Sequence, residues 1–298
     1  MTSPTMPRSR VYAMLMIVLL LWAGNSIVGR AVREDIPPLT LALFRWSGGV
    51  LLLLPFAWRH IRADHAVIKA NWPMILLLGA AGIGAFNGLL YSGLRETTAS
   101  NALLIQAAIP ALVFLFDFVL FRSIPRPAQL IGVAIAAVGV ATIIFEADPA
   151  LLLALQFGRG DLLVLIAVTA WGFYTSLLRR RPPIHPLAFL TLTFMIGVAA
   201  MLPGALLEWR HETIRWSPTV IGAILYVAIF PSLIAYQMFN RAVAEIGAAD
   251  TGQVISLQPL IGAGLAALLL GEALHAYHFA GMVLILLGIA IPMLRRNN

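Results

Sequence analysis

Residues 11–31 read VYAMLMIVLLLWAGNSIVGRA, and residues 161–178 read DLLVLIAVTAWGFYTSLL. Each is a long apolar run that carries a tryptophan and several small or polar residues in its second half. A helix needs about 20 apolar residues to cross the hydrocarbon layer of a bilayer, so both runs predict transmembrane helices. A cleavable signal peptide is the alternative for the first run, because Arg8 and Arg10 precede it. The run extends as far as Val32, which favours a permanent helix.

The whole chain has the composition of a membrane protein. Of its 298 residues, 60% are hydrophobic and 11% are charged, and the mean hydropathy is +0.91. A soluble domain carries about 25% charged residues, so this chain has too few charges to cover a water-exposed surface. It has no cysteine, which excludes disulfides, a cysteine-ligated zinc site and a thiol nucleophile.

Ten apolar stretches of transmembrane length follow one another with short loops between them. They lack the period-two alternation of barrel strands. We therefore predict an all-α membrane protein with ten transmembrane helices and no soluble domain. The predicted helices are residues 11–31, 38–58, 72–93, 98–121, 128–145, 161–178, 187–207, 218–240, 248–270 and 277–294.

Lysine and arginine predict the orientation of these helices. If the N-terminus is cytoplasmic, the inner loops and termini carry 13 of these residues, the outer loops carry 6, and Arg45 lies within a helix. This bias predicts a multi-pass protein of the inner (plasma) membrane with both termini in the cytoplasm. The net charge of +7 is thus explained by positive residues that orient the chain in the membrane, and nucleic acid is not expected as a partner.

The chain partly matches itself at a shift of 148 or 149 residues. The matched pairs include Trp22 and Trp171, Glu96 and Glu245, Pro110 and Pro259, Gly132 and Gly281, and Gly139 and Gly288. The chain is therefore interpreted as two five-helix repeats, residues 1–148 and 149–298. Because five is odd, the second copy enters the membrane the opposite way up. Inverted repeats of this kind recur in secondary transporters.

The residues that mark the two copies resemble EamA repeats. They are Trp22-Ala23-Gly24-Asn25, Pro38-Leu39 and Pro110 in the first copy, and Trp171-Gly172, Pro186, Pro259, Gly271-Glu272 and Gly281 in the second. The resemblance covers nearly the whole chain and is to a ten-helix member of the drug/metabolite transporter superfamily. One departure is Arg122-Ser123, which stands where the second copy has Gly271-Glu272. The resemblance implies export of amino acids and related metabolites, including aromatic amino acids.

Polar side chains inside the predicted helices are candidates for the lining of a central cavity, because such groups are costly in lipid. Flat rings and a few amides would suit a small molecule with an apolar body and polar ends. Hydrogen bonds between helices and aromatic belts at the interfaces explain the same residues, so both interpretations stay open. The candidate substrate-binding residues are Trp22, Asn25, Asn87, Tyr91, Trp171, Tyr174, Tyr236, Gln253 and Arg45.

Two charged residues within the predicted helices have alternative roles. Arg45 lies about 10 Å from the outer end of its helix. Its planar guanidinium suits a substrate carboxylate, but the simpler expectation is that it extends outward to Glu34 or Glu272. Asp117 is expected to reach the inner interface and pair with Arg122 or Arg126.

The remaining motifs favour a transporter over an enzyme. The sequence has no phosphate-binding glycine loop with lysine, no H-E-x-x-H and no nucleophile elbow, so no catalytic, metal or cofactor site is expected. Pro231 and its counterpart Gly82 both weaken a helix. Each is interpreted either as a point where the helix bends during gating or as a simple kink. No mid-helix carboxylate is evident for proton coupling, which favours a facilitator or exchanger.

The predicted function is therefore export of small amphipathic metabolites, most of all aromatic or large neutral amino acids, by alternating access. The expected partners are a small-molecule substrate and the lipid bilayer, and a monomer is expected. The alternatives are an exporter of cationic drugs or other metabolites, and a lipid-precursor flippase.

Overall fold

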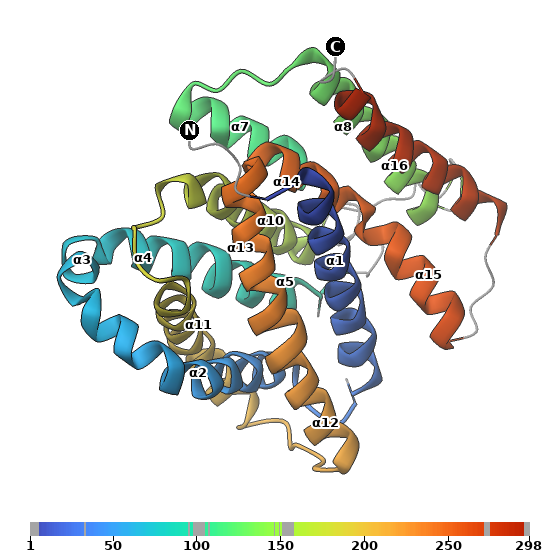
Figure 1. Ribbon diagram of the computed structural model, residues 1–298. Coiled ribbons are helices and arrows are strands. Elements are labelled where there is room, and N and C mark those ends of the chain that lie inside the picture. The colour runs from blue at the N-terminus through green and yellow to red at the C-terminus, as the bar shows by residue number, and fades with distance from the viewer. Residues whose placement is uncertain are drawn as a thin grey trace.

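The computed structural model describes residues 6–32, 34–94, 96–97, 105–106, 108–145, 147–148, 150, 158–270 and 275–294. Every regular element in these ranges is a helix, as predicted (Figure 1). The α-helices are α1 (Arg8–Ala31), α2 (Pro38–Ala63), α3 (His65–Ala70), α4 (Trp72–Gly79), α5 (Phe86–Leu94), α7 (Ile109–Phe121), α8 (Pro127–Ile144), α10 (Arg159–Leu177), α11 (Pro186–Glu208), α12 (Pro218–Val227), α13 (Ala235–Ile246), α14 (Ala248–Val254), α15 (Gln258–Leu270) and α16 (Ala276–Leu294). Two π-helices, η1 (Ala80–Ala85) and η3 (Ala228–Ile234), and two 3₁₀ turns, η2 (Leu178–Arg180) and η4 (Ile255–Leu257), connect or extend them.

Within the described residues, six helices are long and apolar enough to cross a membrane. They are Arg8–Gly29, Pro38–Ala63, Trp72–Leu94, Arg159–Arg180, Pro186–Glu208 and Pro218–Ile246. Three shorter apolar helices are Ile109–Phe121, Pro127–Ile143 and Ala276–Gly288. The predicted stretch 98–121 is only partly covered, because residues 98–104 and 107 lie outside the described residues.

Proline begins several of these helices. Pro38, Pro127, Pro186 and Pro218 are each the first residue of their helix. The backbone N–H groups in the first turn of a helix have no acceptor inside the helix. A proline there, which has no N–H, therefore loses no intrahelical hydrogen bond. These prolines therefore mark the starts of four apolar helices.

Helices α2 and α11 pack side by side in opposite directions, and a carboxylate lies at each end of the pair. At one end, Glu208 accepts backbone hydrogen bonds from Leu39 (3.0 Å) and Thr40 (2.7 Å). At the other, Asp64 accepts one from the backbone N–H of His185 (2.7 Å). Each acid thus satisfies N–H groups at the start of the partner helix, where negative charge is also favoured by the helix dipole. We name the two ends of the molecule the Glu208 end and the Asp64 end.

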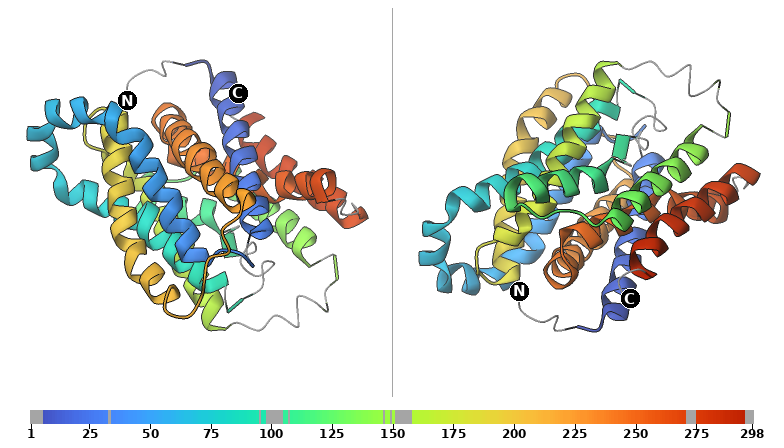
Figure 2. Two further views of the ribbon diagram at one scale, coloured as in Figure 1. Left: turned by 90° about the horizontal axis from the view of Figure 1, so that it is seen from below. Right: turned by 90° about the horizontal axis from the view of Figure 1, so that it is seen from above.

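The chain passes between these two ends from helix to helix. The segment before α12 contacts the segment before α2, where the Arg215 N–H donates to the Asp35 carbonyl (2.8 Å). Near the start of α1, the Met6 N–H donates to the carboxylate of Glu245 at the end of α13 (3.3 Å). Accordingly α1, α4–α5 and α11 run toward the Glu208 end, and α2, α10 and α12–α13 run toward the Asp64 end (Figure 2).

Helices α8 and α16 form a second closely packed pair, although they are far apart in the sequence (Figure 1). A methyl group on Gly139 would lie 2.7 Å from the carbonyl oxygen of Gly281, and one on Gly288 would lie 2.5 Å from that of Gly132. Both distances are too short for a side chain, so glycine allows the two backbones to touch.

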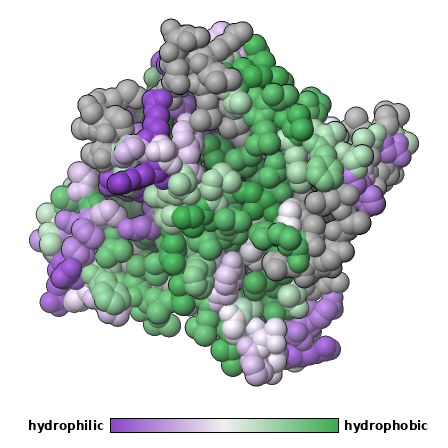
Figure 3. All heavy atoms as spheres, turned by 45° about the vertical axis from the view of Figure 1, so that its right-hand side comes forward, coloured by the Kyte–Doolittle hydropathy of each residue, from purple (hydrophilic) through white to green (hydrophobic). Residues whose placement is uncertain are grey.

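The outer surface is rich in apolar side chains. On α2, for example, Leu51 is 71% exposed and Phe56 is 67% exposed. A space-filling view shows apolar residues over much of one face, with hydrophilic residues gathered toward its edges (Figure 3). An apolar surface of this extent is unusual for a soluble monomer and fits contact with lipid. The structure therefore agrees with a multi-pass membrane protein.

Candidate functional site

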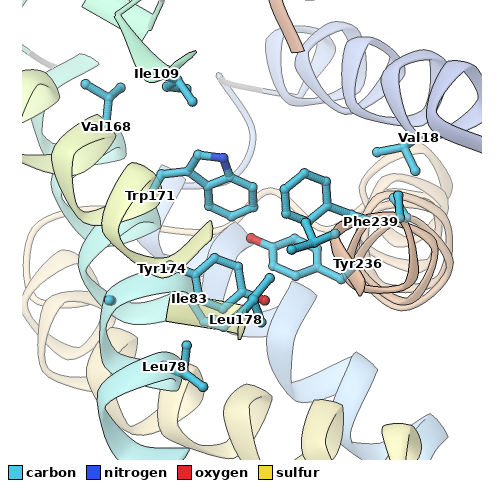
Figure 4. Packing of buried hydrophobic residues seen from close by; sticks show 14 of the residues in the cluster. Val18, Leu78, Ile83, Ile109, Val168, Trp171, Tyr174, Leu178, Tyr236 and Phe239 are labelled. Atoms are coloured by element: carbon cyan, nitrogen blue, oxygen red, sulfur yellow. The ribbon is translucent and has the colours of Figure 1, made fainter. Parts of the chain in front are cut away.

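Aromatic rings of α1, α10 and α13 meet, and we call them the ring cluster, which consists of Trp22, Trp171, Tyr174, Tyr236 and Phe239. Figure 4 shows Trp171, Tyr174, Tyr236 and Phe239 together. The centroid of Trp171 lies 5.6 Å from that of Trp22, 5.3 Å from Tyr174, 5.6 Å from Tyr236 and 5.3 Å from Phe239. The contacts of Trp171 with Trp22 and with Tyr236 are edge-to-face, a geometry that aromatic quadrupoles prefer. Rings that are far apart in the sequence are therefore brought into one place, which fits both the cavity interpretation and the helix-packing interpretation.

Two backbone carbonyls of the π-helices accept hydrogen bonds from this cluster. The Trp22 indole N–H donates to the carbonyl of Pro231 in η3 (3.0 Å), and the Tyr236 hydroxyl donates to the carbonyl of Gly82 in η1 (3.3 Å). Gly82 and Pro231 correspond at the repeat shift of 149, so both copies have a π-helix at the same place. A π-helix displaces backbone groups from the regular α-helical ladder and is frequent at functional sites.

Arg45 of α2 turns toward η3, and 4% of its surface is exposed. Its Nε donates to the Ser232 hydroxyl (2.5 Å), and its two terminal nitrogens make longer bonds to the Tyr91 hydroxyl and the Pro231 carbonyl (3.5 Å each). The guanidinium also lies over the ring of Trp46, 4.4 Å from its centroid. The arginine is therefore part of the interior site.

The expected outward position of Arg45 is thus not adopted. Its side chain is buried instead of reaching toward Glu34, and Glu272 lies outside the described residues. The physical reason is that η3 presents a hydroxyl and a carbonyl oxygen to the guanidinium inside the bundle, and the ring of Trp46 lies beside it. The sequence places the charge at the right depth, but only the packing of α2 against η3 shows which way it points.

A tyrosine and an asparagine close the cluster on the side of the Asp64 end. The Tyr174 hydroxyl donates to Oδ1 of Asn240 (2.8 Å). At the repeat shift of 149, Tyr174 corresponds to Asn25 and Asn240 corresponds to Tyr91, so the two residue types are exchanged. Asn25 and Tyr91, both among the described residues, are not hydrogen-bonded to each other.

Burial differs among the site residues. Trp22, Asn25 and Tyr91 lie in the halves of their helices nearer the Glu208 end and are partly exposed. The other site residues are exposed by 5% or less, namely Arg45 (4%), Asn87 (3%), Trp171 (2%), Tyr174 (1%), Tyr236 (2%) and Asn240 (5%). The three partly exposed residues therefore share one side of the site, although the buried Arg45 and Asn87 also lie in the halves of their helices nearer the Glu208 end.

Two of the sequence-predicted residues have contacts of a different kind. Gln253 donates from Nε2 to the carbonyl of Gly288 (2.9 Å) and so connects α14 to α16. Asn87 donates from Nδ2 to the carbonyl of Ile83 in its own helix (2.9 Å) and lies beside the Tyr236 hydroxyl. The structure thus places Asn87 at the ring cluster and gives Gln253 a helix-packing contact.

Asp117 does not pair with Arg122 or Arg126. Its carboxylate accepts a hydrogen bond from the Ser176 hydroxyl (2.6 Å) and lies 3.7 Å from the guanidinium of Arg179. The cause is the packing of α7 against α10, which brings together residues some 60 positions apart. Among the described residues, no group of three or more histidine, aspartate or glutamate side chains is placed to hold a metal ion.

The structure adds three residues that the sequence argument missed. Phe239 completes the ring cluster, Trp46 lies beneath Arg45, and Ser232 accepts from Arg45 while donating to the carbonyl of Val227 (2.7 Å). A proline cannot donate to the preceding turn, so a hydroxyl next to Pro231 was a usable signal. Trp46 and Phe239 carry no such signal, because apolar rings are common in any membrane helix.

The long apolar helices, the apolar surface and the buried rings, amides and guanidinium define a multi-pass helical membrane protein with a polar centre. The chain belongs to the EamA-like transporter family, whose model matches it twice, over residues 9–145 and 158–294. The resemblance based on the repeat motifs is thereby confirmed, together with the presence of two EamA units.

Relatives and one solved structure extend this likeness over almost the full length. The chain is 25% identical over 288 residues to the uncharacterized transporter YyaM of Bacillus subtilis, covering 95% of this chain and 93% of that protein. It is 28% and 25% identical to probable amino-acid metabolite efflux pumps of Salmonella typhimurium and Escherichia coli, each time covering 93% of this chain and 92% of the relative. A crystal structure 20% identical to it has a TM-score of 0.78 and covers 97% of this chain and 99% of that one, which shows a shared fold.

Proposed function

We propose that this protein is a secondary transporter that exports small amphipathic metabolites, foremost aromatic or large neutral amino acids, by alternating access. It acts as a monomer in the inner (plasma) membrane, with ten transmembrane helices and both termini in the cytoplasm. The observation that carries this proposal is the buried meeting of rings, amides and one arginine at the centre of a bundle whose outer surface is apolar. The likeness to two relatives named as probable amino-acid metabolite efflux pumps agrees with it.

Two inverted units, residues 1–148 and 149–298, are part of this proposal. The direction of the helices supports it, since α1 runs toward the Glu208 end while its counterpart α10 runs toward the Asp64 end. The α8–α16 pair supports it as well, because the contact of Gly139 with Gly281 has the counterpart Gly288 with Gly132. Contacts that are exchanged in this way are expected of two equal units related by a two-fold axis.

Alternating access gives a role to the exchanged tyrosine and asparagine pairs. The Tyr174–Asn240 hydrogen bond closes the site toward the Asp64 end, while Asn25 and Tyr91 are apart and partly exposed toward the Glu208 end. If the two units exchange conformations, the Asn25–Tyr91 pair forms and the Tyr174–Asn240 pair separates. The proposed substrate contacts are Trp22, Asn25, Asn87, Tyr91, Trp171, Tyr174, Tyr236 and Arg45. Gln253 is also proposed, although its side chain contacts α16 and not the ring cluster.

The test is uptake of a panel of labelled amino acids into proteoliposomes, with and without a pH gradient, compared with protein-free liposomes. We expect saturable uptake of aromatic or large neutral amino acids that does not depend on the gradient. Uptake equal to that of protein-free liposomes across the panel would refute the amino-acid assignment. Faster uptake in the presence of the pH gradient would show that the protein is a proton-coupled exporter and not a facilitator.

The lipid-precursor alternative requires an apolar groove that connects the site to the bilayer. One apolar groove of about 290 Å³ lies between α7 and α8. It is lined by Ala111, Phe114, Leu115, Phe118, Pro125, Leu130 and Val133, and none of these residues belongs to the proposed site. This groove therefore does not favour a flippase.

A further inference from the structure

The charge of Arg45 is buried among neutral groups. Its recorded partners are the hydroxyls of Ser232 and Tyr91, the carbonyl of Pro231 and the ring of Trp46. No carboxylate of the described residues forms an ion pair with it. A buried charge is costly unless an opposite charge compensates it, and a planar guanidinium matches a carboxylate in two parallel hydrogen bonds. The site is therefore suited to an anionic group from a ligand.

A donor beside Arg45 lacks an acceptor altogether. The indole N–H of Trp46 is buried and has no hydrogen-bond partner in the described structure, although its ring lies directly beneath the guanidinium. Buried polar groups normally have partners, so an exception at the centre of a transporter indicates a missing acceptor. This observation is independent of the charge of Arg45 and also indicates a ligand rich in acceptor atoms.

The carbonyl of Pro231 supplies the opposite chemistry at the same place. It accepts from the Trp22 indole (3.0 Å) and lies 3.5 Å from a terminal nitrogen of Arg45. A backbone carbonyl in a water-poor site is a good acceptor for an ammonium group, and backbone carbonyls in the discontinuous helices of transporters bind cations. Once a ligand displaces the Trp22 indole, the guanidinium and this carbonyl side by side match a ligand whose carboxylate and ammonium share one carbon atom.

We propose that Arg45 and the Pro231 carbonyl together bind the α-carboxylate and α-ammonium of a free amino acid. In this structure the Ser232 hydroxyl and the Trp22 indole occupy the positions that these two groups take. The amino-acid side chain then lies against Trp22, the partly exposed member of the ring cluster. The inference rests on the proposed function and narrows it, because it excludes amines without a carboxylate and acids without an ammonium.

Binding of three indole compounds to the purified protein in detergent tests the proposal. L-tryptophan carries both charged groups, tryptamine lacks the carboxylate, and indole-3-propionate lacks the ammonium. We expect tryptophan to bind at least about tenfold more tightly than either analogue, since each analogue leaves a charged or polar partner unpaired. Equal affinity for the three compounds, or no binding of tryptophan, would overturn the proposal.

Variants of Arg45 test whether this residue causes the tighter binding of tryptophan than of tryptamine. Arg45→Gln is expected to reduce the preference for tryptophan over tryptamine by about tenfold, and Arg45→Lys, which keeps the charge but loses the planar fork, by less. The matched control is Arg62→Gln, because Arg62 also lies on α2 over a tryptophan ring, that of Trp58 (4.9 Å), but at an exposed position. An unchanged preference in folded Arg45→Gln would overturn the assignment.

Two outcomes separate this inference from the proposed function. Transport of tryptamine as fast as tryptophan would refute the head-group site while leaving a transporter in place. Selective binding of tryptophan without uptake into liposomes would leave the head-group site in place and refute transport. If Arg45→Gln does not fold, the affinities of the wild-type protein and of Arg45→Lys for the three indole compounds test the proposal.

Discussion

At the scale of single residues, Trp171 and Tyr91 differ in what they contribute. Trp171 is 2% exposed and contacts four other rings of the site within 5.6 Å, so its side chain is both a proposed substrate contact and a part of the packing. Tyr91 is partly exposed and is held by a single long hydrogen bond from Arg45. The two substitutions should therefore be judged by different measurements.

Replacement of Tyr91 by alanine should strongly reduce uptake and leave the thermal unfolding temperature in detergent nearly unchanged. Replacement of Trp171 by alanine should reduce both, because removal of a buried tryptophan costs about 3–5 kcal/mol. Trp72→Ala serves as the control, since Trp72 is 58% exposed. Normal uptake by Tyr91→Ala would assign that residue to helix packing.

At the scale of helices, the α8–α16 pair depends on the absence of side chains. We expect Gly139→Ala to destabilise the protein by about 1–3 kcal/mol, because the added methyl group meets the backbone of Gly281 and the backbone cannot yield. The matched variant is Gly222→Ala in α12, where nothing lies within 4 Å of the added methyl group. It should be neutral or stabilising by up to about 1 kcal/mol.

Thermal unfolding of both variants in the same detergent is the measurement. Equal unfolding temperatures for the two variants would show that α8 and α16 do not touch as described. The comparison cancels the general effect of replacing glycine by alanine in a helix, because both residues lie within apolar helices.

The exchanged tyrosine and asparagine pairs make a prediction about helix movement. The chain has no cysteine, so pairs of introduced cysteines report single distances. Tyr174→Cys with Asn240→Cys should be bridged by a short bis-methanethiosulfonate cross-linker in the conformation described here, since the hydrogen-bonded side chains span the gap that the shorter cysteines leave. Asn25→Cys with Tyr91→Cys should be bridged only in the opposite conformation.

Non-reducing gel electrophoresis after treatment with the cross-linker measures both pairs. Each cross-link is expected to block uptake, and reduction is expected to restore it. Simultaneous formation of both cross-links in one quadruple-cysteine molecule would contradict reciprocal opening, because the two pairs are proposed to close in turn.

At the scale of the whole molecule, the two ends of the bundle are proposed to face opposite sides of the membrane. The Asp64 end carries the start of α1 and the end of α13 and is proposed to face the cytoplasm. A single cysteine at exposed Arg215, near the Glu208 end, should react with a membrane-impermeant maleimide in intact cells. A cysteine at exposed His65 should react only after permeabilisation. The reverse pattern would invert the proposed topology.

Sequence patterns predicted much of the architecture because lipid imposes simple constraints. Backbone groups in a bilayer must be bonded within the segment, so a long apolar run with few charges predicts a helix. This is why α1 and α11 were predicted within three residues of their observed bounds. The two EamA units were equally visible, since prolines and glycines keep their spacing where backbones bend or touch.

The direction and partners of polar side chains depended on the tertiary structure. Arg45 was expected to extend outward and instead turns inward, because η3 supplies acceptors that lie 186 and 187 residues away in the sequence. Asp117 pairs across α7 and α10 for the same reason. In an apolar interior a polar group bonds to whichever partner the packing brings near, and sequence distance gives no measure of that proximity.

By itself the sequence determined that the chain is surrounded by lipid, that it forms long apolar helices and that it contains a duplication. Each of these properties follows from the length of the hydrophobic runs and from local backbone chemistry. Only the tertiary structure decided that Trp22, Trp171 and Tyr236 meet, and that a guanidinium and a proline carbonyl lie side by side. Those contacts depend on how the two units pack against each other. Packing is a property of complementary surfaces far apart in the chain, which no local pattern encodes.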